Sequence, residues 1–403
     1  MTKTDQSPPL LAEPAARLPA VAYVLTFCIA VIGSNSLVLG PIAPEVARAL
    51  GTSVALVMSA SAAFGLGTAA SALLMARHVD RFGARRMLLW ALVGLAAALA
   101  LSALSPAVPA LAGAQLAAGV ASGIALPAIY ASAAAVAPTG RESRTIGVVL
   151  TGWTLSMVAG VSLSAFVADY IHWRAVYAVV ALLALSAFLT LKASRYRDLP
   201  AAGPAPQPLA ALRIAGVKPL LVACAAFMSA FYGVYGYLGD HLHTGLGEPV
   251  SANGIVALVY GIGFGTAAFL DGIVDRLGPR RVMPFAFLAV GTVYLGFALA
   301  GGSFVAVLVL TLLWGLTNHF GLNVLIMRLA AIDPARRGTI MGLNSAVTYL
   351  AVFAGTTGFG PLYAARGFAF AALTALILML VAAAAGSWRW RDRTERPTQG
   401  LAP

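Results

Sequence analysis

Long runs of apolar residues recur along the whole chain, and they constrain its fold more than any other feature. The 403 residues are 60% hydrophobic and only 10% charged, with a mean hydropathy of +0.88. A soluble domain cannot bury so large an apolar fraction, whereas about 20 apolar residues in an α-helix cross the hydrocarbon core of a bilayer. The run lengths predict an all-α membrane protein with twelve transmembrane helices. These helices are expected near 19–42, 53–76, 87–104, 108–136, 146–170, 175–191, 219–239, 253–274, 282–300, 304–327, 339–362 and 367–385.

The basic residues indicate how these helices are oriented. When the gaps between apolar runs are assigned alternately to two sides, all but three of the 26 lysines and arginines fall on the side of both termini. The exceptions are Arg48, Arg174 and Arg366. Because positive loops stay in the cytoplasm, both termini are expected there, in the inner membrane of a bacterial-type cell. The formal net charge of +12 arises from these loops, so no nucleic-acid partner is predicted.

Two copies of one loop sequence indicate that the chain consists of two related halves. Residues 80–86 read Asp-Arg-Phe-Gly-Ala-Arg-Arg, and residues 275–281, 195 positions later, read Asp-Arg-Leu-Gly-Pro-Arg-Arg. The same offset carries Gly160 to Gly355. Internal repeats of this kind are typical of transporters built from two pseudo-symmetric bundles.

The repeat and one long polar gap predict five segments. The gap between the halves contains four prolines, so a continuous helix is not expected there. The predicted segments are a cytoplasmic N-terminal tail at 1–18, an N-terminal six-helix bundle at 19–191, a cytoplasmic linker at 192–218, a C-terminal six-helix bundle at 219–385 and a cytoplasmic C-terminal tail at 386–403.

These features resemble the major facilitator superfamily over essentially the whole chain. The loop at 80–86 is similar to the signature of that family between helices 2 and 3, and the loop at 275–281 is similar to its echo between helices 8 and 9. Within the superfamily the chain resembles the twelve-span drug–proton antiporters and the arabinose-efflux-like sugar exporters. The supporting residues are Gly-Pro-Ile-Ala-Pro at 40–44, Gly160-Val161 and Trp173-Arg174. The resemblance implies a monomer whose two bundles rock around one central site.

By this resemblance, the two repeated loops latch the cytoplasmic side shut. An Asp at this place can accept hydrogen bonds from the free amide groups at the start of a neighbouring helix, and the arginines can pair with acids or lipid phosphates. The alternative is topogenic charge alone, which requires neither the Asp nor the Gly. The predicted latch residues are Asp80, Arg81, Gly83, Arg85, Arg86, Asp275, Arg276, Gly278, Arg280 and Arg281.

Polar residues within the apolar runs are candidates for binding and coupling, because such residues are costly in lipid. His319 lies nine residues before Arg328 and is expected near the midplane. If its helix turns it inward, it is expected to border the central cavity with Asn35 and a polar group of the fourth or fifth helix. Asp271 is expected near the cytoplasmic edge and Asp240 at the outer end of its helix. His319, Asp240 and Asp271 are the candidates for proton coupling. The predicted substrate-binding residues, each of which can instead serve only in helix packing, are Asn35, Gln115, Trp153, Tyr232, Tyr235, His319, Asn323 and Asn344.

The predicted function is secondary active transport of a small organic solute by alternating access. Proton-coupled efflux of a neutral sugar-like, nucleoside-like or drug-like molecule is favoured, since no deep Lys, Arg or acid is expected to bind a charged one. Related antiporters carry an intramembrane Arg where this chain has Gln115, which keeps open an uncoupled facilitator or importer. An alternative of another class is a membrane receptor or assembly factor that has the same fold and does not transport.

No enzyme activity, metal or cofactor is predicted. The sequence contains no Gly-x-x-x-x-Gly-Lys-Ser/Thr phosphate loop, no His-Glu-x-x-His and no Gly-x-Ser-x-Gly. His241 and His243, with Asp240, offer too few ligands for a metal site. Cys28 and Cys224 both lie within apolar runs and are expected to act as small apolar side chains rather than to form a disulfide.

Overall fold

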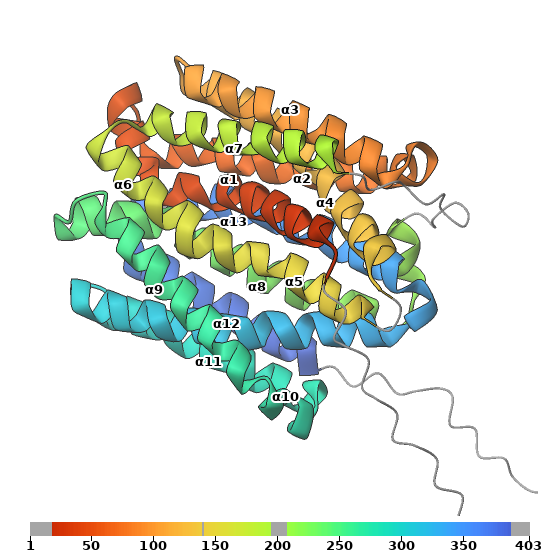
Figure 1. Ribbon diagram of the computed structural model, residues 1–403. Coiled ribbons are helices and arrows are strands. Elements are labelled where there is room, and N and C mark those ends of the chain that lie inside the picture. The colour runs from red at the N-terminus through yellow and green to blue at the C-terminus, as the bar shows by residue number, and fades with distance from the viewer. Residues whose placement is uncertain (1–17, 139–140, 195–207, 388–403) are drawn as a thin grey trace, which may run out of the picture.

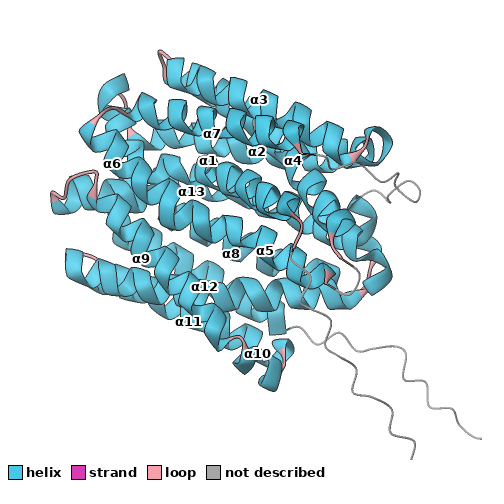
Figure 2. Cartoon of the chain, viewed as in Figure 1, coloured by secondary structure: helices cyan, strands magenta, loops and turns pink. Residues whose placement is uncertain are grey.

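The computed structural model describes residues 18–138, 141–194 and 208–387, with the backbone alone at 76–81, 134 and 142–144. The predicted tails, 1–18 and 386–403, and the first part of the predicted linker therefore lie almost wholly outside the described residues. Figure 2 shows that helices joined by short loops make up nearly all of the described chain. This confirms the predicted all-α fold.

The described residues form thirteen α-helical segments. These are α1 (Ala20–Leu50), α2 (Val54–Phe82), α3 (Ala84–Leu104), α4 (Val108–Val136), α5 (Glu142–Leu155), α6 (Ser162–Tyr170), α7 (Trp173–Ala193), α8 (Val217–Asp240), α9 (Ala252–Ala267), α10 (Gly272–Leu277), α11 (Pro279–Ala300), α12 (Phe304–Ile332) and α13 (Arg337–Ser387). Two π-helical segments, Ser156–Val161 and His241–Gly245, and three 3-10 segments, Pro208–Arg213, Ala268–Leu270 and Pro334–Arg336, adjoin them.

Eleven continuous helical stretches of the described chain are long and apolar enough to cross a membrane. The difference from the expected twelve lies in α13, which includes both of the last two expected spans. The backbone of α13 breaks at Gly367, where φ is 76° and ψ is −176°. Only glycine adopts this conformation easily, because a Cβ would clash with the backbone. The break at Gly367 divides α13 into the two expected helices.

Connections between the helices alternate between the two ends of the bundle, as Figure 1 shows. We name the end that carries Gly83 and Gly278 the near end, and the end that carries Gly51, His172 and Gly301 the far end. Helices α1–α7 form the N-terminal half and α8–α13 the C-terminal half. The near ends lie toward the right of Figure 1 and the far ends toward the left.

The backbone at the two repeated loops is nearly the same in the two halves. Gly83, between α2 and α3, has φ 88° and ψ 139°, and Gly278, between α10 and α11, has φ 82° and ψ 140°. A side chain is strained at such positive φ values. The glycine of the repeated sequence is therefore required by the turn that reverses the chain between two spans.

Close helix packing also repeats between the halves. Gly67 of α2 and Gly119 of α4 each lie so near the other helix that an added Cβ would overlap a main-chain carbonyl oxygen. Gly263 of α9 and Gly315 of α12, 196 positions later, make the same contacts. Small residues allow helices to approach in this way, and dispersion contacts then hold them together in lipid. The repeat seen in the sequence is thus also a repeat of tertiary contacts.

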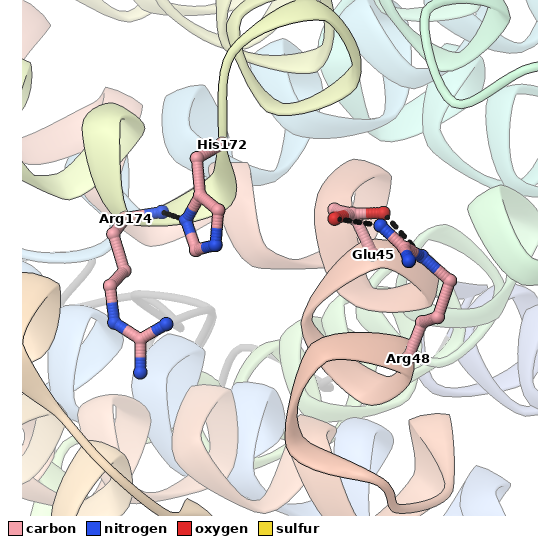
Figure 3. A network of polar contacts seen from close by, with 4 residues as sticks. All are labelled: Glu45, Arg48, His172 and Arg174. Atoms are coloured by element: carbon pink, nitrogen blue, oxygen red, sulfur yellow. Dashed lines mark hydrogen bonds and ion pairs between the residues drawn. The ribbon is translucent and has the colours of Figure 1, made fainter.

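Polar groups are satisfied locally at the far ends of α1 and α7, as Figure 3 shows. In the last turn of α1, Arg48 pairs with Glu45 across one helical turn, at 2.6 Å. At the start of α7, His172 Nδ1 accepts a hydrogen bond of 3.1 Å from the backbone N–H of Arg174. His172 therefore caps α7, supplying an acceptor for an amide that has no partner within the helix.

Candidate functional site

Three polar side chains of the C-terminal half meet where the end of α9 lies against α12. His319 Nε2 lies 2.9 Å from Asp271 Oδ1, and Asn323 Nδ2 donates to the same oxygen at 2.8 Å. His319 and Asn323 are one helical turn apart on α12, and Asp271 lies at the junction of α9 and α10. The side chains of His319 and Asp271 are 14% and 36% exposed. We refer to these three residues as the His–Asp cluster.

Aromatic rings border the His–Asp cluster. The ring of Phe264, on α9, lies 5.0 Å from that of His319 and nearly perpendicular to it, at 73°. Phe320 lies edge-on to the same imidazole at 5.9 Å. The helix changes to 3-10 geometry at Ala268–Leu270, just before Asp271. Such a change redirects the residues that follow, and here it precedes the carboxylate that reaches α12.

The structure brings two of the three proton-coupling candidates into contact. Asp271, which was expected near the cytoplasmic edge, places a carboxylate oxygen 2.9 Å from the imidazole of His319. Asp240 lies apart from them, at the far end of α8, where it accepts hydrogen bonds from Tyr363 at 2.7 Å and Thr244 at 2.8 Å. The hydrogen-bond partner of His319 is therefore Asp271, a pairing that the sequence did not indicate, and Asn35 is bonded to Gln115.

Asn35 and Gln115 form a buried amide pair inside the N-terminal half. Asn35 Nδ2 donates to Gln115 Oε1 at 3.1 Å, and Gln115 Nε2 donates back to Asn35 Oδ1 at 3.2 Å. Gln115 also donates to Ser102 Oγ at 3.1 Å. The network joins α1, α4 and α3, and all three side chains are buried. Much of the hydrogen-bonding capacity of this pair is therefore used within the protein.

A cluster of aromatic side chains joins α8, α9 and α12 of the C-terminal half. Phe231 on α8 is its hub, with ring centroids 5.0 Å from Tyr232, 5.4 Å from Tyr235, 5.7 Å from Tyr260 and 5.2 Å from Trp314. All five side chains are buried. Tyr260 belongs to α9 and Trp314 to α12, so the cluster joins three helices of the C-terminal half. We refer to these five residues as the aromatic cluster.

The remaining predicted substrate residues lie apart from one another. Trp153, on α5, is half-buried against Gly33 of α1. Asn344, on α13, is buried, and its Oδ1 accepts no hydrogen bond from a described residue. Phe231 and Tyr260 were not singled out from the sequence. The spacing of Phe231 and Tyr235, four residues apart on one helix, is the signal that could have identified the first of them.

The structure describes only some of the predicted latch side chains. Asp80 and Arg81 lie outside the described side chains. Arg85 donates hydrogen bonds to carbonyl oxygens at the end of α7, in its own half, and Arg86 lies 5.0 Å from the ring centroid of Trp90. The second copy is exposed at Asp275, Arg276, Arg280 and Arg281. Asp275 forms no ion pair or hydrogen bond with the described residues.

Comparison with known proteins identifies the family. The Major Facilitator Superfamily model matches residues 25–356, which is most of the chain. The protein belongs to the Major Facilitator Superfamily. It is therefore a multi-pass membrane transporter of small molecules and not an enzyme, as the sequence predicted.

Several relatives within the Major Facilitator Superfamily match over much of their length. The chain is 26% identical over 361 residues to the Uncharacterized MFS-type transporter YwfA of Bacillus subtilis, covering 88% of each. It is 29% identical over 281 residues to the Chloramphenicol resistance protein of Streptomyces lividans, covering 68% of this chain and 70% of that one. It is 26% identical over 227 residues to a Probable sugar efflux transporter of Pasteurella multocida, covering 55% of each.

Solved structures of the superfamily have the same fold. A bacterial homolog of the human lysosomal transporter Spinster, in an inward-facing and unoccupied conformation, superimposes with a TM-score of 0.74 at 14% identity and covers 91% of this chain and 95% of that one. The human organic anion transporter MFSD10 gives a TM-score of 0.70 at 19% identity, covering 93% of this chain and 100% of that one. At these identities the likeness establishes the fold alone.

Proposed function

We propose that the protein exports a small neutral organic solute in exchange for protons, by alternating access between its two halves. The His–Asp cluster carries this proposal, because it places an ionisable pair near the middle of α12. Ionisable residues at such depth are costly unless they are paired, and in transporters they mark ion and proton pathways. Imidazole is the side chain whose charge changes most readily near neutral pH.

The charge of the cluster explains how proton binding would be coupled to reorientation. With a neutral His319 and an ionised Asp271 the cluster has a net charge of −1, and with a protonated His319 its net charge is zero. Exposing a net charge to the low-dielectric interior is costly, so the two protonation states favour different conformations. Asn323 donates to Asp271 in this structure, which keeps the carboxylate hydrogen-bonded when the imidazole changes charge.

The aromatic cluster supports a neutral substrate. Its five side chains carry no charge, and aromatic walls with a few hydroxyl groups are typical of sites for small organic molecules. Tyr235 has a buried hydroxyl that makes no hydrogen bond to a described residue. Tyr232, Tyr235, Asn323 and His319 thus remain our candidates for substrate contact. Two relatives named for chloramphenicol resistance and for sugar efflux also favour export of an organic solute.

We assign the near end to the cytoplasm of a bacterial inner membrane. The assignment follows from the lysines and arginines, nearly all of which lie on the side of the termini. The protein then works as a monomer, with one substrate path between its two halves.

The test is transport by purified protein in proteoliposomes. Radiolabelled chloramphenicol and arabinose are the probes, and counterflow is measured with and without an imposed pH gradient. We expect a pH gradient to drive accumulation of at least one probe by the natural protein. His319→Gln and Asp271→Asn should keep counterflow and lose this accumulation, because each removes one member of the ionisable pair. His172→Gln, which alters a histidine at the far end, is the matched control and should retain both.

The alternatives give different outcomes. Counterflow that ignores the pH gradient in the natural protein would identify an uncoupled facilitator, which the uncharged Asn35–Gln115 pair of the N-terminal half favours. Saturable binding without counterflow would identify a receptor. Accumulation that persists in both cluster variants would place the proton site elsewhere, with Asp240 the next candidate.

A further inference from the structure

The start of α9 joins the two halves at the far end. Asn253 Nδ2 donates a hydrogen bond of 2.7 Å to the backbone oxygen of Pro41 in α1. Two residues earlier, the backbone N–H of Ser251 donates to Asp169 Oδ2, at the end of α6, at 3.1 Å. Figure 1 shows the far ends of α6 and α9 next to each other, and the two helices are in contact. Residues 251–253 of the C-terminal half are thus bonded to two helices of the N-terminal half.

Backbone contact between α1 and α8 makes this join tight. A Cβ added to Gly239 would lie 2.8 Å from the carbonyl oxygen of Gly40, and one added to Gly40 would lie 3.1 Å from that of Tyr235. Pro44 has no N–H, so the Gly40 carbonyl lacks the usual helical donor four residues on. Asn253 Nδ2 also lies 3.4 Å from the oxygen of Gly239. One amide group therefore spans the place where the two halves meet.

We propose that Asn253 is a positioning residue that holds the far end closed, so that its release is required before the far end can open. The proposal rests on the transporter working by alternating access. Asn253 is 3% exposed, and its Nδ2 is directed at main-chain oxygens of both halves. When the halves separate, the contact with Pro41 must break while the contact with Gly239 lies within one half. The residue therefore distinguishes the closed far end from the open one.

The unpaired side of the same amide keeps the closure reversible. Asn253 Oδ1 is buried and accepts no hydrogen bond from a described residue. A buried acceptor without a donor is unfavourable, so it offsets part of the gain from the Nδ2 bonds. Opening hydrates both atoms at once. The free-energy difference between the closed and open forms is then smaller than it would be if Oδ1 also accepted a hydrogen bond. This suits a residue that must release in every transport cycle.

Asn253→Asp is the direct test, because it keeps the shape of the side chain and, when ionised, has no donor. A carboxylate would face the oxygen of Pro41 and should favour the open far end. The readout is labelling of Ser36→Cys by a membrane-impermeant maleimide, in a chain with Cys28→Ala and Cys224→Ala. Ser36 is buried on α1, one turn from Gly40 toward the near end. Labelling of the exposed position Gly302→Cys establishes from which side the far end is reached.

We expect Asn253→Asp to raise the labelling rate of Ser36→Cys from the far side about tenfold, as loss of one hydrogen bond to a main-chain oxygen would predict. The matched control is Asn318→Asp, which also replaces a buried amide by an acid, at a side chain that donates a 2.9 Å hydrogen bond to Tyr260 within the C-terminal half. It should leave the labelling rate unchanged. Equal rates in Asn253→Asp and the natural background would overturn the proposal, and so would an equal increase in the control.

A second measurement covers the case in which Asn253→Asp does not fold. Asp169→Cys and Ser251→Cys introduce a pair of cysteines where the two halves touch, at a site whose aspartate is exposed. The two cysteines are joined by a short, cleavable bifunctional thiol reagent while Ser36→Cys is reversibly blocked. After the block is removed, far-side labelling of Ser36→Cys should be suppressed, and cleavage of the reagent should restore it. Undiminished labelling of the joined protein would contradict a closure at residues 251–253. Neither measurement needs a substrate or a pH gradient, so the outcome is independent of the proposed proton coupling.

Discussion

Two helix pairs, α2 with α4 and α9 with α12, occupy equivalent places in the two halves and differ at one contact. Gly119 in α4 and Gly315 in α12, 196 residues later, each lie against a carbonyl oxygen of the partner helix. One turn along, α4 has Gly123, which also lies against the partner backbone. At the equivalent place α12 has His319, whose imidazole pairs with Asp271. The close contact of the first pair is thus replaced by an ionisable one in the second.

This difference teaches how an ionisable pair can arise within a repeated architecture. Lipid offers helices little hydrophobic drive to associate, so small residues and a few polar contacts decide where they touch. In the N-terminal pair three glycines favour a rigid, uncharged contact. In the C-terminal pair two of these are kept, and the third place carries a side chain that can change its charge. The change from α-helical to 3-10 geometry at Ala268–Leu270 directly precedes Asp271, which pairs with His319.

The change with the largest expected effect on stability would impose the C-terminal pattern on the N-terminal pair. Gly123→His places a Cβ and a ring where Ser71 Oγ and the Thr68 carbonyl already lie. We expect destabilisation of about 3 kcal/mol or more, seen as loss of monodisperse protein. Gly113→His, on the same helix but with open space at the Cβ, should give far more folded protein. Equal yields of the two variants would show that the N-terminal contact is loose.

A smaller effect is expected from testing the shared contact in both halves. Gly119→Ala and Gly315→Ala each add a Cβ against a carbonyl oxygen, so each should lower the unfolding free energy by about 1–3 kcal/mol. The thermal unfolding midpoint measures the change. Gly113→Ala and Gly272→Ala, where the added methyl group meets no atom within 4 Å, are the controls. A clear difference between the two test variants would break the equivalence of the helix pairs.

The repeated loops should respond in parallel and less strongly. Gly83→Ala and Gly278→Ala each force a side chain to a positive φ, at a cost of about 1 kcal/mol. The unfolding midpoints of the two variants should fall by similar amounts. Gly338→Ala, at a helical position with ordinary backbone angles and space for a methyl group, serves as the reference. A fall in only one variant would show that the loops share a sequence without sharing a function in folding.

The smallest effect on stability is expected where the effect on coupling is largest. His319→Gln removes the ionisable group that distinguishes α12 from α4 at this position and keeps an amide of similar reach that can donate to Asp271. Asp271 also keeps its hydrogen bond from Asn323, so the unfolding midpoint should change little. Accumulation driven by a pH gradient in proteoliposomes should nevertheless be lost. A variant that keeps this accumulation would show that the difference between Gly123 and His319 has no role in coupling.

The site could be predicted only in part, and the contrast between His319 and Asn253 shows why. His319 stood out because an ionisable residue inside an apolar run is improbable without a purpose. Asn253 lies in the first turn of α9, next to a polar loop, where an amide side chain is common and does not by itself indicate a function. Asn35 and Gln115 were identified as polar residues within the spans, yet nothing in the sequence indicates that they bind each other. That pairing depends on the relative rotation of α1 and α4.

The sequence by itself determined the membrane environment, the helical class, the two related halves and the glycines at their turns and contacts. Hydropathy, helix length and backbone sterics act locally, so they can be read one residue or one span at a time. Only the tertiary structure decided that Asp271 reaches His319 across 48 residues, and that Asn253 binds Pro41 across 212. These contacts depend on how far each helix is turned and displaced against its neighbour. In lipid, the rotation and displacement of each helix are set by side-chain packing over the whole interface, which cannot be inferred from any single stretch of sequence.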